Sequence, residues 1–78
     1  MARVYLSKKW RGSVLLVTIC DEELLGKRFS EGKAVLDVRE DFYGGGLVDV
    51  EEALDELEGC QMAILIGENT IKAAIKRG

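Results

Sequence analysis

The residues whose types could do chemistry are most concentrated in one basic segment near the start of the chain, Lys8-Lys9-Trp10-Arg11. Cations around an indole ring can contact RNA phosphates while the ring stacks on a base, a contact that contributes about 1 to 3 kcal/mol per base. The structural alternative is a solvated hairpin tip whose tryptophan folds back on the sheet. These four residues are our candidates for nucleic-acid binding.

A second candidate surface is the aromatic pair Phe42-Tyr43, which precedes three glycines in the stretch REDFYGGGLVD, residues 39–49. A glycine-rich turn ahead of a helix can cradle a phosphate. Here Asp49 is expected to cap the helix that follows, so an anion would meet a negative charge. We therefore interpret residues 44–46 as a turn that reverses the chain without side-chain clash. The aromatic pair is either core or a partner surface, and its solvent exposure distinguishes the two.

Cys20 is the candidate nucleophile of an alternative function, a small enzyme. It stands at the expected end of a strand just before a helix, a position that can lower the pKa of a thiol. The acids at 21–23 act in the opposite sense, and the chain has no histidine to serve as a base. A buried structural cysteine is therefore favoured. Cys20 and Cys60 fit neither a zinc-ligand nor a redox spacing, so we expect two reduced thiols.

Two groups of neighbouring acids have the residue types for Mg²⁺ binding or acid–base work: Asp21, Glu22 and Glu23, and Asp37, Glu40 and Asp41. Adjacent acids on a short chain rarely converge on one ion. In the enzyme alternative, Cys20 or one of these acidic clusters lies in a groove that a dimer completes. The sequence otherwise assigns no catalytic residue, no metal and no cofactor.

The composition predicts a soluble globular protein with one domain, residues 1–78. Apolar residues make up 47% and charged residues 32%, which excludes disordered and fibrous classes. The net charge of −3 gives no general attraction to RNA or membranes, so such contact needs a local patch. No run approaches the roughly 20 apolar residues of a membrane helix, and no signal peptide is recognisable, so we expect a cytoplasmic protein. A chain this short builds a small core, which a homodimer or another partner can complete.

Hydrophobic periodicity predicts the elements that position these residues. Strands are expected at residues 4–7, 14–19, 33–38 and 62–66. A hairpin through residues 8–13 joins the first two strands. Asp21 is expected to cap a short helix at 22–25, and Asp49 a second helix whose apolar face recurs at helical spacing. A last helix runs to residue 77.

The element order is ββαβαβα, which predicts an α+β fold: a mixed four-stranded sheet with short helices packed on it. The crossover from strand 33–38 through the second helix to strand 62–66 should be right-handed, which makes these two strands parallel. Strand 14–19 is apolar on both faces and needs cover on both. If the short helices cannot supply that cover, a dimer partner must.

Three stretches, in order along the chain, resemble a known family. They are Cys20 to Lys27 followed by Phe29, then Phe42 to Gly45, then Leu65 to Glu68 leading into the last helix. The chain resembles the small archaeal proteins of domain of unknown function 424. This resemblance implies an archaeal, cytosolic source, and the placement of such genes near translation genes would imply a link to RNA or the ribosome. The family brings no established activity, cofactor or catalytic residue.

The sequence thus leads to the hypothesis of a non-catalytic interaction module tied to RNA or to translation. Its partner is either ribosomal RNA or an unknown protein, bound through the tip at residues 8–11 and the surface at Phe42 and Tyr43. The small enzyme is the alternative.

Overall fold

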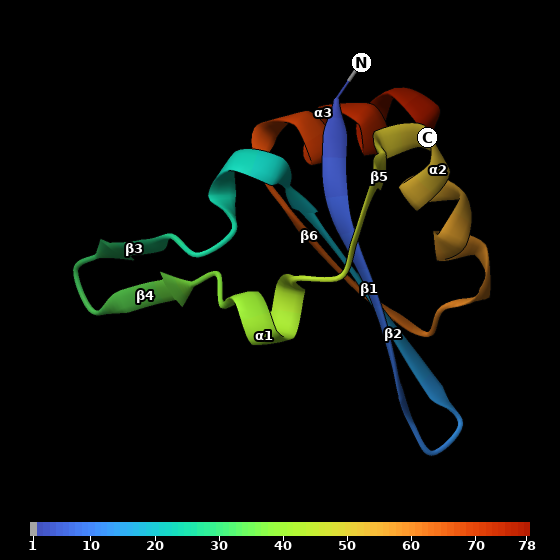
Figure 1. Ribbon diagram of the computed structural model, residues 1–78, viewed down its shortest axis with the longest axis horizontal. Coiled ribbons are helices and arrows are strands. Elements are labelled where there is room, and N and C mark those ends of the chain that lie inside the picture. Colours follow the sequence, from blue (N-terminus) through green and yellow to red (C-terminus); the bar gives the residue numbers. More distant parts are fainter. Residues whose placement is uncertain (1) are drawn as a thin grey trace.

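The computed structural model describes residues 2–78, in which strands alternate with short helices (Figure 1). The strands are β1 (Arg3–Arg11), β2 (Val14–Asp21), β3 (Arg28–Glu31), β4 (Ala34–Asp37), β5 (Gly46–Asp49) and β6 (Met62–Ile66). The α-helices are α1 (Glu40–Tyr43), α2 (Val50–Asp55) and α3 (Glu68–Arg77), and the 3₁₀ helices are η1 (Glu22–Leu24) and η2 (Glu56–Gly59).

Four strands form the main sheet in the order β5-β1-β2-β6. β1 is antiparallel to both β2 and β5, whereas β6 is parallel to β2. The connection β5-α2-β6 therefore crosses between parallel strands. α2 and α3 both pack on one face of the sheet, which we call the helix face (Figure 1). The predicted α+β fold, with a mixed four-stranded sheet and short helices packed on it, is confirmed.

The strand expected at residues 33–38 does not join the main sheet, and in this detail the structure differs from the prediction. β3 and β4 pair only with each other and form a two-stranded arm, residues 28–37, in which every residue is exposed. The arm projects from the body of the molecule at the left of Figure 1. Two backbone hydrogen bonds close its base, from Gly26 N–H to Val38 O at 2.7 Å and from Val38 N–H to Lys27 O at 2.9 Å.

The place beside β1 is taken by β5, and the glycine run makes this possible. Gly45 lies against the backbone of β1, where a Cβ atom would collide with the carbonyl oxygen of Leu6. Gly44 ends α1, and its N–H donates to Glu40 O at 2.8 Å. The glycines at 44–46 therefore allow a close approach between two backbones, whereas the turn expected there from sequence is not formed, because Gly44 is extended and Gly46 already begins β5.

The main core lies between the helix face and the two longer helices. Alternate residues of β1 and β2 point towards this face and are buried by apolar residues of α2 and α3. The fully or almost fully buried members are Val4, Leu15, Val17, Ile19, Val50, Ala53 and Leu54.

A smaller core covers only part of the opposite face of the sheet. Cys20, Val38 and Ile66 are buried there beneath η1 and the segment that leads into α1, and Tyr43 packs against them. The cover stops at α1. The other end of this face, near the β1–β2 hairpin, is left without a second layer, and Val14 and Met62 are exposed.

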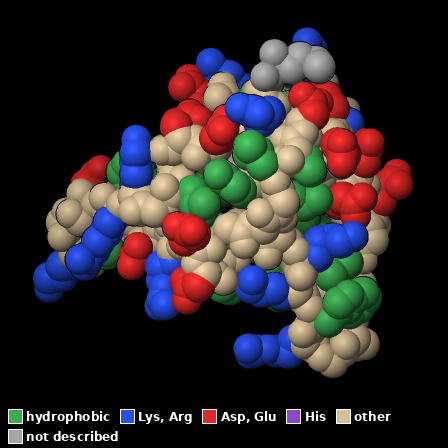
Figure 2. All heavy atoms as spheres, viewed as in Figure 1, with side chains coloured by type: hydrophobic (Ala, Val, Ile, Leu, Met, Phe, Trp, Pro, Cys, Tyr) green, Lys and Arg blue, Asp and Glu red, His purple; other side chains and the backbone are tan. Residues whose placement is uncertain are grey.

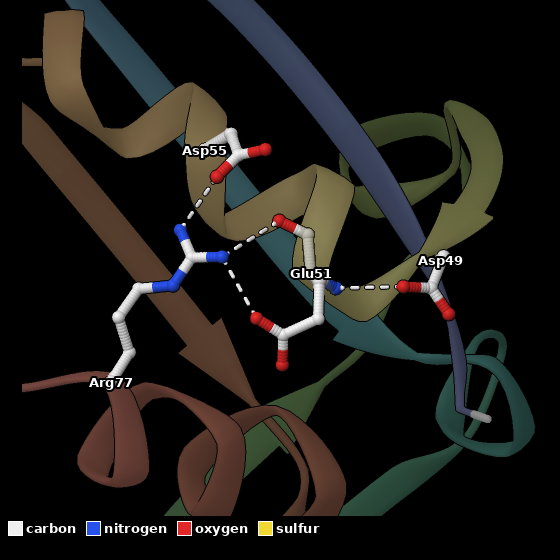
Figure 3. Close-up of polar contacts among 4 residues, drawn as sticks. All are labelled: Asp49, Glu51, Asp55 and Arg77. Carbon is white, nitrogen blue, oxygen red and sulfur yellow. Dashed lines mark hydrogen bonds and ion pairs between the residues drawn. The ribbon is translucent and has the colours of Figure 1, made fainter.

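Polar contacts at the surface fasten α2 to α3 (Figure 3). The guanidinium of Arg77 donates to Asp55 Oδ1 and to Glu51 Oε1, both at 2.8 Å. At the start of α2, Asp49 Oδ2 accepts a hydrogen bond from Glu51 N–H at 3.1 Å, so Asp49 caps this helix as expected. A basic residue near the end of α3 also suits the negative end of the helix dipole.

Asp21 caps a different helix from the one expected. Its side chain makes no capping bond to η1. Its carboxylate instead accepts from Asn69 N–H and Thr70 N–H, both at 2.9 Å, and from the Thr70 hydroxyl at 2.6 Å, at the start of α3. Gly67 makes room for this contact, because a Cβ there would collide with the carboxylate. Asp21 is 1% exposed, so this long-range cap is a buried one.

We predict that Asp21→Ala lowers the free energy of unfolding by about 2 to 4 kcal/mol, because it leaves buried donors at the start of α3 without an acceptor. The matched control is Asp49→Ala, which removes the single cap of α2 and should cost about 1 kcal/mol. Urea denaturation followed by circular dichroism measures both. Equal losses in the two variants would show that the buried cap has no special importance.

Candidate functional site

The uncovered end of the opposite face forms a groove of about 510 Å³. Residues from β1, β2, α1 and β6 line it: Lys9, Trp10, Arg11, Val14, Leu16, Phe42 and Met62. Its volume is in the range of small-molecule and nucleobase sites, and its lining is mainly apolar with two cations at one side. We call these seven residues the groove.

The groove forms because the sheet extends further than the elements that cover it. Strand register sets Leu16 beside Met62, and both belong to the face that η1 and α1 protect only at its other end. The β1–β2 hairpin continues past this point to a turn at Gly12 and Ser13. Trp10 stands near that turn with 68% of its surface exposed, so it does not fold back on the sheet.

Lys9 joins the two surfaces that the sequence analysis had singled out separately. Its ammonium nitrogen lies 5.1 Å from the centroid of the Phe42 ring and donates a hydrogen bond to Ser7 Oγ at 3.2 Å. A cation at this distance is attracted to the face of an aromatic ring. The Phe42 ring in turn meets Tyr43 edge to face, with centroids 4.8 Å apart. The amino group of Lys9 is thus held at the rim of the groove.

The candidate residues from the sequence do not all reach the groove. Lys8 points to the helix face, where its amino group forms an ion pair with Glu56 at 2.6 Å. Tyr43 is half-buried and packs with the smaller core. Lys9, Arg11 and Phe42 are brought together at the groove, and Trp10 borders it from the other side of β1, the side that it shares with Lys8. Val14, Leu16 and Met62 were not predicted as site residues. The one indication in the sequence was that the second strand is apolar on both faces, so that each face needs cover.

Charge is distributed unevenly around the molecule (Figure 2). The segment 50–59, which forms α2 and η2, carries five acids and no Lys or Arg. Acidic side chains gather at the right of Figure 2 over α2, whereas on the lower side Lys and Arg side chains lie among a few acidic ones. Within residues 2–78, neither Lys9 nor Arg11 forms an ion pair with a carboxylate. Two cations without a carboxylate partner in this part of the chain therefore lie beside the groove.

Cys20 lies outside the groove in the smaller core. It is fully buried, and its thiol donates to the carbonyl oxygen of Asp21 at 3.3 Å. Burial, and to a lesser degree the charges of Asp21 and Glu23, raise the pKa of this thiol to about 11. A nucleophilic cysteine needs the opposite shift, because the thiolate is the reactive form. Cys20 and Cys60 are both free thiols, and the arrangement gives no support to Cys20 as a nucleophile.

The two acidic groups considered from the sequence do not form a metal centre. Asp21 is used in the cap of α3. Across residues 2–78, no three Cys, Asp or Glu side chains gather in a way that could hold an ion. In the same part of the chain, no helix has the length and apolar character needed to cross a membrane.

The fold and the groove define a small α+β protein with one mixed sheet and an exposed, partly apolar site at its hairpin end. The chain belongs to the family described as protein of unknown function (DUF424), whose model matches residues 9–78. The resemblance noted in the sequence is thereby confirmed.

One solved structure is similar over most of the chain. It is an uncharacterized conserved protein from Methanopyrus kandleri, with a TM-score of 0.72 and 26% sequence identity. The similarity covers 96% of this chain and 73% of that one. No curated protein matches the sequence.

We predict that Cys20 in the folded protein reacts with iodoacetamide at pH 8 at least about 100-fold more slowly than an unperturbed thiol, because its raised pKa leaves little thiolate and burial blocks access. Mass spectrometry on Cys60→Ser, which retains only Cys20, measures this rate. Cys20→Ala, which retains only the half-buried Cys60, is the control and should react faster. Rapid alkylation of folded Cys60→Ser would restore the enzyme alternative.

The same pKa shift predicts a loss of stability in alkali. Folding opposes ionisation of Cys20, so its contribution is fully present below the ordinary thiol pKa of 9.0 and is lost as the pH rises through about 11. The free energy of unfolding of Cys60→Ser, measured by urea denaturation between these pH values, should fall more steeply than that of Cys20→Ala. Parallel pH profiles for the two variants would contradict this reasoning.

Proposed function

We propose that this protein is a non-catalytic module that binds single-stranded RNA through the groove. The observation that carries this proposal is the pair of cations Lys9 and Arg11, which form no ion pair within residues 2–78 and lie beside the apolar floor of the groove, with the exposed ring of Trp10 at the edge of the same strand. An exposed tryptophan is costly in water unless it has a partner, and a nucleobase is a partner that also brings a phosphate for each cation.

The chemistry of the groove suits unpaired bases. Proteins recognise single-stranded RNA by stacking splayed bases on aromatic rings while cations follow the backbone. The half-buried Phe42 offers a ring for stacking at the rim of the groove, and Trp10, 68% exposed on the other side of β1, offers a second at the edge of the groove. Lys9 and Arg11 lie on the same side of β1, because residues two apart on a strand point to the same face. Loops of ribosomal RNA present such unpaired bases.

The acidic side of the molecule favours one orientation of the RNA. The five acids of segment 50–59 lie on the helix face, on the other side of the sheet from the groove. They repel a polyanion, and the net charge of −3 gives no general attraction to offset that repulsion. Binding therefore depends on a small number of contacts at the groove, and its affinity should be modest and sensitive to salt.

We expect Lys9→Ala and Arg11→Ala each to weaken binding of a fluorescein-labelled single-stranded RNA oligonucleotide. Each should also reduce the slope of log affinity against log salt concentration by about 0.7, the value for one lost phosphate contact on a single strand. Fluorescence anisotropy over a salt series measures both quantities.

Lys8→Ala is the matched control, since Lys8 is the neighbouring cation but points to the other face. It should leave the slope unchanged. Three variants with the slope of the wild type would exclude phosphate contacts at this surface. Tight binding of an acidic peptide in place of the RNA would assign the groove to a protein partner.

We further expect RNA to quench the fluorescence of Trp10, which is the only tryptophan in the chain and therefore reports on the hairpin end of β1. Trp10→Ala should lose about 1 to 3 kcal/mol of binding free energy, the contribution of one stacked base. Trp10→Phe keeps an aromatic face and should retain most of it. Unchanged emission on saturation with RNA would show that no base stacks on this ring.

A further inference from the structure

The main sheet ends in a strand whose outer edge has no partner within residues 2–78. β6 pairs with β2 on one side only. In Figure 1 it lies behind β1, on the side of the main sheet away from the viewer. An unpaired edge presents backbone N–H and C=O groups that can bond to another strand.

The backbone groups that face outwards are those of Ala63 and Leu65. Leu15 of β2 turns its own groups towards β6, because its N–H donates to Gln61 Oε1 at 2.6 Å and its C=O accepts from Gln61 N–H at 3.1 Å. Odd-numbered residues of β2 therefore bond to β6. With the observed parallel register they bond to Met62, Ile64 and Ile66, and the intervening residues point to the free edge.

This edge lacks the features by which proteins protect exposed strands. Segment 61–66 contains no charged residue, no proline and no glycine. Lysines, prolines and short length are the usual means of discouraging a second strand. The other edge strand, β5, is of similar length, four residues against five in β6, but it begins at Gly46 and ends at the charged Asp49.

An apolar stripe on α3 lies above the same edge. α3 contacts both β2 and β6. Ile75 is 75% exposed and Ile71 is 40% exposed, and their spacing of four places them on one face of the helix. Arg77 reaches across to α2, and residues two apart on a helix point in nearly opposite directions. Ile75 is therefore turned away from α2.

We propose that a second copy of this chain pairs with β6 in an antiparallel manner, about a two-fold axis at Ile64. With this axis, Ala63 of each copy lies opposite Leu65 of the other. The outward N–H and C=O groups of both residues are then satisfied in reciprocal hydrogen bonds, which is the pattern of an antiparallel ladder. The uncharged edge brings no like charges together, so it is complementary to itself.

The spacing of the layers supports the same arrangement. Paired strands lie about 4.8 Å apart. If α3 sits above the middle of the β2–β6 pair, the axes of the two α3 helices are two strand spacings apart, about 10 Å, which is a normal distance for packed helices. Ile71 and Ile75 of each copy then bury their exposed surfaces between the helices. The small side chain of Ala63, on the same face, leaves room for this approach.

Analytical ultracentrifugation of the full chain tests the proposal. The wild type should sediment at twice the chain mass of 8.6 kDa, and Ile75→Glu should raise the dimer dissociation constant by at least about tenfold. Val35→Glu is the control, because it places the same charge on a residue of the arm that is 52% exposed. A wild type that stays monomeric up to millimolar concentration, or a dimer that Val35→Glu disrupts and Ile75→Glu does not, would overturn the proposal.

Amide hydrogen exchange followed by NMR shows whether the strands themselves pair. The N–H groups of Ala63 and Leu65 should exchange at least about tenfold more slowly in the dimer than in monomeric Ile75→Glu. Other amides at the surface, such as those of the arm, should be unaffected. Equal exchange at Ala63 and Leu65 in dimer and monomer would rule out pairing through β6. None of these measurements involves RNA, so their outcome is independent of the function proposed for the groove.

Discussion

The structure depends on one constraint: both faces of β2 must be covered by other parts of the protein. Its residues are apolar on each side, so each side exposed to water costs free energy. The helix face receives a full layer from α2 and α3, and Val17 and Ile19 are completely buried there. The opposite face receives only η1, Val38 and the short α1. Within residues 2–78 no further element covers this face, and the groove lies where this second layer ends.

Asp21 connects the two layers at the far end of β2. It is the last residue of the strand, so its position is fixed by the sheet. Its carboxylate holds the start of α3 on the helix face, and η1 begins at the next residue and covers the opposite face. The rigid end of the molecule is therefore the Asp21 end, and the exposed end is the hairpin that carries Trp10. A binding surface on a well-anchored scaffold is a common arrangement, since the anchored part supplies the stability.

Elements whose burial follows a local pattern could be predicted from the sequence. The prediction failed for residues whose position depends on a partner far away in the chain. Strand β2, helix α2 and strand β6 followed from periodicity because their apolar faces are buried as the pattern requires. The alternation in residues 34–38 is equally regular, yet it forms the exposed arm, because an arm and a sheet strand have the same period. Lys8 was grouped with its neighbours because nothing local indicates its ion pair with Glu56. The floor of the groove was missed for the same reason, since Met62 meets Leu16 only through register.

The groove and the free edge of β6 share only Met62, whose side chain lines the groove while its backbone bonds to β2, so occupation of one leaves the other open. The groove opens on the face opposite the helices, whereas the proposed pairing extends the sheet sideways. The proposed two-fold axis is perpendicular to the plane of the sheet. The two copies would then form one sheet of eight strands, with both grooves on the same face. A single RNA strand that reached both would bind the second groove at a high effective concentration, which compensates for weak binding at each. Under the two proposals together, pairing would bring two further cations, those of the second groove, to the same RNA strand.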